Sequence, residues 1–116
     1  MNIIIDNREK ELKEYFKNKE FISFENLDIG DIIIKYNDKI ELIIERKTLE
    51  DLATSIKDGR YKEQKIRLKA CKIDPGNIYY LIEGKEKSKI CGLKYDIIIS
   101  SILSILLRDK FKVIRT

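Results

Sequence analysis

The spacing of apolar residues predicts a chain that alternates between strands and helices. β-Branched and apolar runs of strand length occupy residues 2–5, 21–27, 77–83 and 111–115. Apolar positions at helical spacing instead mark a segment after residue 7 and the segments 48–58, 60–71 and 95–107. In the first helix we expect Leu12, Tyr15 and Phe16 to form the apolar stripe and Asp6 or Asn7 to supply the cap.

The segment from residue 31 to residue 47 is expected to form a β-hairpin. Two apolar stretches flank residues 37–38, Asn-Asp, which is a pair typical of tight turns. A register with Tyr36 opposite Ile40 sets Lys35 across from Glu41. Because opposite charges paired across two strands are mildly favourable, we prefer this register to a one-residue slip.

The same register brings two carboxylates together. It places Asp31 opposite Glu45 on one face of the hairpin, and Lys47 lies two residues further along that face. A slip by one residue would move Asp31 and Glu45 to opposite faces. The hairpin therefore predicts a cluster of two acids and one lysine.

The order of elements predicts the fold class. The sequence β-α-β-β-β-α-α-β-α-β is typical of an α/β fold in which helices flank a central mixed sheet in three layers. With 116 residues, the chain has the length of one domain, residues 1–116, and it could be a fragment of a longer protein. Residues 84–92 are expected to form a loop with three lysines, Lys85, Lys87 and Lys89.

Composition narrows the chemistry more than it identifies a partner. The formal net charge of +4 is compatible with nucleic acid or an anionic surface without requiring either. The absence of histidine excludes metal sites and general bases built on imidazole. Cys71 and Cys91 lack metal-site spacing and are expected to be reduced thiols. No apolar run reaches membrane-spanning length, so we expect a soluble, intracellular protein.

The cluster of Asp31, Glu45 and Lys47 meets the needs of metal-assisted phosphodiester hydrolysis. Two converging carboxylates repel each other unless a cation lies between them, and Mg²⁺ prefers oxygen ligands. A neighbouring lysine can orient a water molecule or stabilise negative charge in the transition state. The alternative, on this evidence alone, is a solvated sheet face with surface ion pairs.

Several ordered motifs surround this cluster. In chain order they are DNRE at 6–9, GD at 30–31, ERKxxxD at 45–51, SIKDGR…Q at 55–64, IYYLIE at 78–83 and VIRT at 113–116. Together they resemble the XPF family of structure-specific endonucleases, which belongs to the restriction-endonuclease-like PD-(D/E)XK superfamily. The resemblance covers nearly the whole chain.

The resemblance implies a role for each motif residue. Asp31 and Glu45 would be metal ligands, with Asp6 a third acidic contributor. The carbonyl of Arg46 would complete the metal's protein ligands, and Lys47 would be the catalytic lysine. Four motif side chains would contact phosphate or organise the site: Arg8, Arg46, Arg60 and Gln64.

Some of these residues also have structural explanations. Asp6 could cap a helix, and Asp51 fits the capping box that begins at Thr48. In a regular strand Arg46 points away from Glu45 and Lys47, so an ion pair, for example with Asp51, competes with a DNA contact.

The resemblance further implies a function and its requirements. The chain would be an endonuclease that uses Mg²⁺, or Mn²⁺ in its place, to cut flapped or forked DNA at junctions in repair or recombination. It would pair with a second nuclease domain, in a homo- or heterodimer. No helix-hairpin-helix domain, which family members usually use to bind duplex DNA, follows in this sequence. The alternatives are a non-catalytic partner subunit and a basic DNA-binding module whose carboxylates are only structural.

Overall fold

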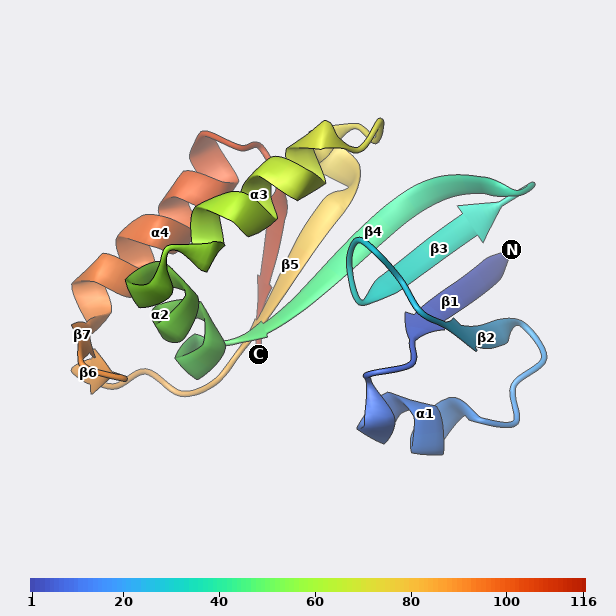
Figure 1. Cartoon of the computed structure of the whole chain (residues 1–116), viewed down its shortest axis with the longest axis horizontal. Coiled ribbons are helices and arrows are strands. Elements are labelled where there is room, and N and C mark those ends of the chain that lie inside the picture. Colours follow the sequence, from blue (N-terminus) through green and yellow to red (C-terminus); the bar gives the residue numbers. More distant parts are fainter.

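The computed structural model describes residues 1–116 and contains one six-stranded mixed sheet flanked by helices (Figure 1). The strands are β1 (Asn2–Asp6), β2 (Ile22–Glu25), β3 (Ile32–Tyr36), β4 (Lys39–Thr48), β5 (Ile78–Glu83), β6 (Lys89–Ile90), β7 (Leu93–Lys94) and β8 (Lys112–Arg115). The helices are α1 (Lys10–Phe16), α2 (Leu49–Asp58), α3 (Arg60–Ala70), α4 (Tyr95–Leu107) and the 3₁₀ turn η1 (Pro75–Asn77). The predicted α/β class with a mixed central sheet is confirmed.

The sheet has the strand order β2-β1-β3-β4-β5-β8. β1 runs antiparallel to β3, and β3 runs antiparallel to β4, whereas β4, β5 and β8 are parallel neighbours. In Figure 1, α2, α3 and α4 lie together beside the half of the sheet that contains β4, β5 and β8, while α1 lies near β1 and β2. None of the helices combines the length and the apolar content needed to span a membrane.

The core lies between the β4–β5 region and the helices. Alternate residues of β5, Ile78, Tyr80 and Ile82, are almost fully buried, as the two-residue period of a strand requires. They belong to one apolar cluster with residues of α2 and α4 that recur at helical spacing: Leu49, Leu52, Ala53, Ile98, Ile102 and Ile105. One face of β5, and therefore of its neighbour β4, is covered by helices.

The hairpin forms, but its register differs between its two ends. Near the site, Ile32 lies opposite Ile44, which is the predicted register and continues to Asp31 opposite Glu45. Near the turn, Tyr36 lies opposite Lys39 and Lys35 opposite Ile40, so the expected pairing of Lys35 with Glu41 was wrong.

The difference between the two ends is caused by a β-bulge. The shift occurs between the pairs of Ile34 and Lys35, and it leaves Glu41 as the extra residue of β4. Asn37 and Asp38 both adopt a left-handed backbone, with φ of 53° and 62°, and so close a two-residue turn.

The first helix also differs from its prediction. α1 begins only at Lys10, after Glu9 at the N-cap position, so neither Asp6 nor Asn7 caps it. The helix buries none of its residues, and Tyr15 is 79% exposed. The expected apolar stripe of α1 is therefore not a core face.

The predicted loop at residues 84–92 contains a short strand. Lys89–Ile90 pairs with Leu93–Lys94 as the hairpin β6-β7, with Cys91 at a φ of 49° and Gly92 at 84° in its turn. The buried side chain of Ile90 explains the hairpin, because it joins the core cluster.

Candidate active site

Asp31 lies at the point where three strands meet. Its amide donates a hydrogen bond to the carbonyl of Ile44 at 2.9 Å, and its own carbonyl accepts one from the amide of Asp6 at 2.8 Å. Its carboxylate atom Oδ2 accepts a hydrogen bond from the amide of Arg46 at 2.7 Å. These contacts fix the carboxylate beside Glu45.

Gly30 makes this placement possible. Its φ of +75° lies in the left-handed region, and a Cβ atom at this position would lie 2.6 Å from Ile43 Cγ2. Glycine is therefore required twice at this position, once by the backbone conformation and once by the close approach of β4. The GD motif thus contains a residue that the fold needs, followed by a residue that lines the cleft.

We expect Gly30→Ala to destabilise the fold more than Gly59→Ala does. Gly59 has nearly the same φ, +77°, but nothing lies within 4 Å of its added Cβ. Gly59→Ala measures the backbone strain, about 1 kcal/mol, and Gly30→Ala adds a steric clash of about 1–3 kcal/mol. Urea unfolding of both variants provides the test, and equal losses of free energy would contradict the steric argument.

Glu45 and Lys47 lie on the face of β4 that the helices cover. In the parallel ladder Glu45 pairs with Tyr80 and Lys47 with Ile82, and both partners are buried. Burial, reinforced by the charge of Asp31, raises the pKa of Glu45 to about 7. Burial likewise raises the pKa of Asp31. The two carboxylates thus share a site in which negative charge is costly.

Lys47 is held by a residue of α3. Its ammonium Nζ donates a hydrogen bond to Gln64 Oε1 at 2.9 Å. Since an ammonium group on a flexible stem is otherwise mobile, this contact restricts where Nζ lies. Gln64 thus contacts the lysine of the ERK motif directly.

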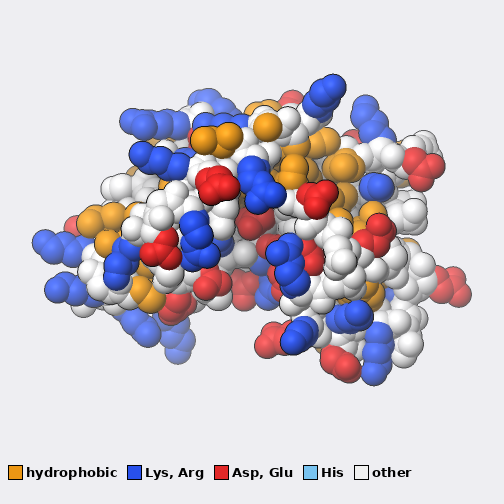
Figure 2. Space-filling model, in the orientation of Figure 1, with side chains coloured by type: hydrophobic (Ala, Val, Ile, Leu, Met, Phe, Trp, Pro, Cys, Tyr) orange, Lys and Arg blue, Asp and Glu red, His pale blue; other side chains and the backbone are white.

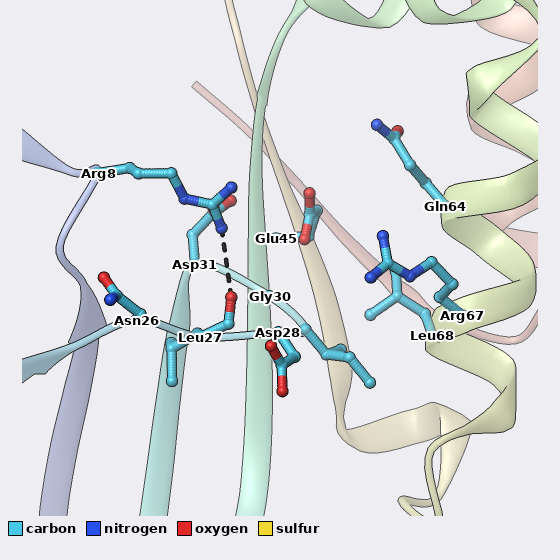
Figure 3. Close-up of a pocket in the computed structure, with 11 residues that line it drawn as sticks. Arg8, Asn26, Leu27, Asp28, Gly30, Asp31, Glu45, Gln64, Arg67 and Leu68 are labelled. Atoms are coloured by element: carbon cyan, nitrogen blue, oxygen red, sulfur yellow. Dashed lines mark hydrogen bonds between the residues drawn. The ribbon is translucent and has the colours of Figure 1, made fainter.

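Asp6 supports the site through Arg8. Its carboxylate is fully buried and accepts hydrogen bonds from the Arg8 amide at 2.9 Å and from the Arg8 guanidinium. The hydrogen bond to the Arg8 side chain lowers the pKa of Asp6 despite its burial. Arg8 also donates to the carbonyl of Leu27 at 3.3 Å (Figure 3). Asp6 thus fixes the exposed guanidinium of Arg8.

A cleft of about 500 Å³ lies between α3 and the chain segment 26–31, and Asp6 and Lys47 are not part of its lining. Figure 3 shows Asp31 and Glu45 in the middle of the cleft, with Arg8 on one side and Gln64 and Arg67 reaching in from α3 on the other. The full lining is Arg8, Asn26, Leu27, Asp28, Ile29, Gly30, Asp31, Glu45, Gln64, Arg67 and Leu68.

Arg46 lies on the other face of the strand, as the alternation of the strand predicts. Its guanidinium pairs with Glu9 and with Glu83, the latter at 3.0 Å, and not with Asp51. All three side chains are mostly buried. The ion pairs join the start of α1, β4 and the end of β5 directly behind the amide that holds Asp31.

Two further motif residues lie outside the cleft. Arg60 pairs with Asp58 at 3.4 Å, with both side chains more than half exposed. Asp51 completes the start of α2, because its amide donates to Thr48 Oγ1 at 3.0 Å, the first half of the predicted capping box.

The sequence prediction missed three polar residues of the cleft, namely Asn26, Asp28 and Arg67. For Arg67 a signal existed, since it lies three residues after Gln64 and therefore on the same face of α3. For Asn26 and Asp28 no periodicity was available, because they lie in the irregular segment between β2 and β3.

The donor set suits a hard cation that keeps part of its water shell. No three side chains of His, Cys, Asp or Glu are grouped so as to hold a metal ion by themselves. Asp31 and Glu45 offer two neighbouring carboxylates, and the pKa of each is raised mainly by burial. Mg²⁺ commonly binds through one or two carboxylates, with water and phosphate oxygens completing its octahedron.

Comparison with known proteins gives matches along almost the whole chain. The model of a family described as the ERCC4 domain matches residues 5–116. The ERCC4 domain-containing protein EP364R of African swine fever virus is 35% identical over 105 residues, which are 86% of this chain and 28% of the viral protein. The probable crossover junction endonuclease mus81 of Dictyostelium discoideum is 43% identical over 95 residues, 70% of this chain and 10% of that protein.

A solved structure shares the fold. XPF from Aeropyrum pernix, in complex with DNA, superposes with a TM-score of 0.74 at 21% identity, covering 99% of this chain and 56% of that chain. The chain thus spans only a part of each of these relatives. The chain belongs to the ERCC4 domain family, and the resemblance to XPF-family nuclease domains that its motifs indicate is confirmed.

Proposed function

We propose that this domain is a divalent-metal-dependent DNA endonuclease that hydrolyses phosphodiester bonds at the cleft. The observation that carries the proposal is the placement of two half-buried carboxylates, Asp31 and Glu45, in one cleft, where the Arg46 amide fixes that of Asp31. Burial alone would favour apolar residues at these positions. A pair of acids kept in this environment is explained by a cation that binds between them.

Each neighbouring residue has a part in this proposal. Asp31, Glu45 and the carbonyl of Arg46 would hold Mg²⁺, or Mn²⁺ in its place. The bound ion supplies Lewis acidity toward a phosphate oxygen and acidifies a water molecule. Lys47, restrained by Gln64, presents its ammonium to the charge that develops on the phosphate. Arg8, fixed by Asp6, presents a second cation at the opposite side of the cleft.

Branched DNA is the substrate class that we propose, with a role in repair or recombination. Two relatives bear on it, since one is named a probable crossover junction endonuclease and the other is an XPF in complex with DNA. The leading alternative is a non-catalytic subunit that binds DNA. It is disfavoured because the acids and the lysine of the GD…ERK motif are all present and adjoin one cleft.

A second nuclease domain is the partner that we propose. α4 exposes apolar side chains at its C-terminal end, where Leu103, Leu106 and Leu107 are 47%, 40% and 62% exposed. On β8, Ile114 is 47% exposed. Exposed apolar side chains of this size favour burial against another surface.

The direct test is a cleavage assay on labelled flap, fork, nicked and linear DNA. We expect cleavage with Mg²⁺ or Mn²⁺, none in EDTA, and faster cleavage of the flap and the fork than of linear duplex. Full activity in EDTA would contradict the metal mechanism. Metal-insensitive binding without any cleavage would favour a DNA-binding module instead.

A further inference from the structure

Arg67 is an arginine of the cleft that lies outside the sequence motifs. It extends from α3 toward the space beside Glu45 and Gly30 (Figure 3). It lies on the cleft-facing side of α3, three residues after Gln64. Arg8 lies on the other side of the same space.

The guanidinium of Arg67 has no hydrogen-bond or ion-pair partner within the protein. Most other arginines of the chain do: Arg8 pairs with Asp6, Arg46 with Glu9 and Glu83, Arg60 with Asp58, and Arg115 donates to the carbonyls of Ile82 and Gly84. An unpaired guanidinium offers its full fork of donors to a ligand with paired acceptor oxygens.

The distribution of charge on the surface and in the cleft makes the positive charge of Arg67 more important for binding DNA. Basic and acidic side chains interleave over the face seen in Figure 2, so that face has no large basic patch to attract DNA by itself. Within the cleft, the carboxylates of Asp28, Asp31 and Glu45 repel a phosphate chain. A DNA strand in the cleft therefore needs local cations, and of the two arginines in the lining Arg67 is the one that no carboxylate pairs with.

We propose that Arg67 binds a backbone phosphate of the DNA strand that enters the cleft, on the α3 side of Asp31 and Glu45. The contact is to a phosphodiester and not to a base. It positions the strand and adds affinity that does not depend on sequence. This inference rests on the proposed function, since it names how that site holds its substrate.

The test compares Arg67→Gln with Arg108→Gln. Arg108 is also exposed and without a side-chain partner, but it lies at the end of α4 and not in the lining of the cleft. Binding of a fluorescein-labelled forked duplex is measured by anisotropy in EDTA at several salt concentrations. We expect Arg67→Gln to weaken binding about tenfold and to lower the salt slope by about one, and Arg108→Gln to change neither.

Cleavage in Mg²⁺ supplies the second readout. Arg67→Gln should raise KM with little change in kcat, and Arg67→Lys should recover part of the affinity because it keeps the charge but loses the fork. An unchanged salt slope in Arg67→Gln would overturn the proposal, even if cleavage is intact. If the wild type does not cleave but the slope changes as expected, the phosphate contact stands and the endonuclease function fails.

Discussion

Asp31→Asn is expected to lower the rate of Mg²⁺-dependent cleavage by about a thousandfold or more, without unfolding the domain. The amide oxygen of asparagine can still accept the hydrogen bond from the Arg46 amide, so the local backbone should persist. The variant loses the negative charge that, with Glu45, would hold the cation. Rates on a labelled flap substrate measure the effect.

Thermal unfolding of the same variant separates chemistry from folding. Because burial raises the pKa of Asp31, its charged form is disfavoured in the metal-free fold. Asp31→Asn should therefore leave the Tm of the metal-free protein equal or higher. Asp38→Asn, the same change in the exposed turn of the hairpin, is the matched control and should cleave normally. An active Asp31→Asn enzyme would refute the assigned role of this carboxylate.

Asp109→Ala should cost about 3–5 kcal/mol of unfolding free energy, the usual loss when one partner of a buried ion pair is removed. The side chain of Asp109 is 2% exposed and lies 2.6 Å from the ammonium groups of Lys65 and Lys69. Lys65 is only 13% exposed, so the variant leaves a buried charge without a partner. Asp58→Asn, which breaks the exposed pair with Arg60, should cost at most about 1 kcal/mol. Urea unfolding at neutral pH measures both.

The ion pairs of Asp109 also predict that the free energy of unfolding falls at acidic pH. Burial raises the pKa of Asp109, but its contacts with the ammonium groups of Lys65 and Lys69 outweigh burial, so the pKa ends below its usual value. A carboxylate with a depressed pKa contributes stability above its unfolded pKa and loses it as the pH falls through the folded value. The difference in stability between wild type and Asp109→Ala should therefore shrink below about pH 4. A constant difference would show that the carboxylate is not charged in the fold.

Local patterns predicted the elements and the central pair of the site. Helix α4 has the predicted bounds. Its long apolar run indicates a helix without any knowledge of distant contacts. Asp31 and Glu45 lie across from each other in the predicted register, although the pairing of Lys35 with Glu41 that favoured this register does not form.

What could not be predicted depends on contacts between distant segments. The bulge at Glu41 allows a two-residue turn at one end of the hairpin and the core register at the other. Neither the turn residues nor the apolar pattern predicts it by itself. Arg46 finds Glu9 and Glu83 because β4 lies between the end of β5 and the start of α1, each 37 residues away in sequence. Lys65 and Lys69 pair with Asp109 because the turn after α4 lies against α3, a contact that the local sequence does not reveal.

Gly30 and Asp31 are adjacent in the motif, but two different requirements explain them. The glycine is explained by geometry, since any other residue would be strained at its φ and would place a Cβ atom 2.6 Å from Ile43 Cγ2. The aspartate is explained by the metal binding proposed for the site. If a related domain lost the proposed enzymatic role but kept this fold, we expect the glycine of the GD motif to be retained and the aspartate to be replaced. The glycine then becomes a marker of ancestry, and the aspartate a marker of activity.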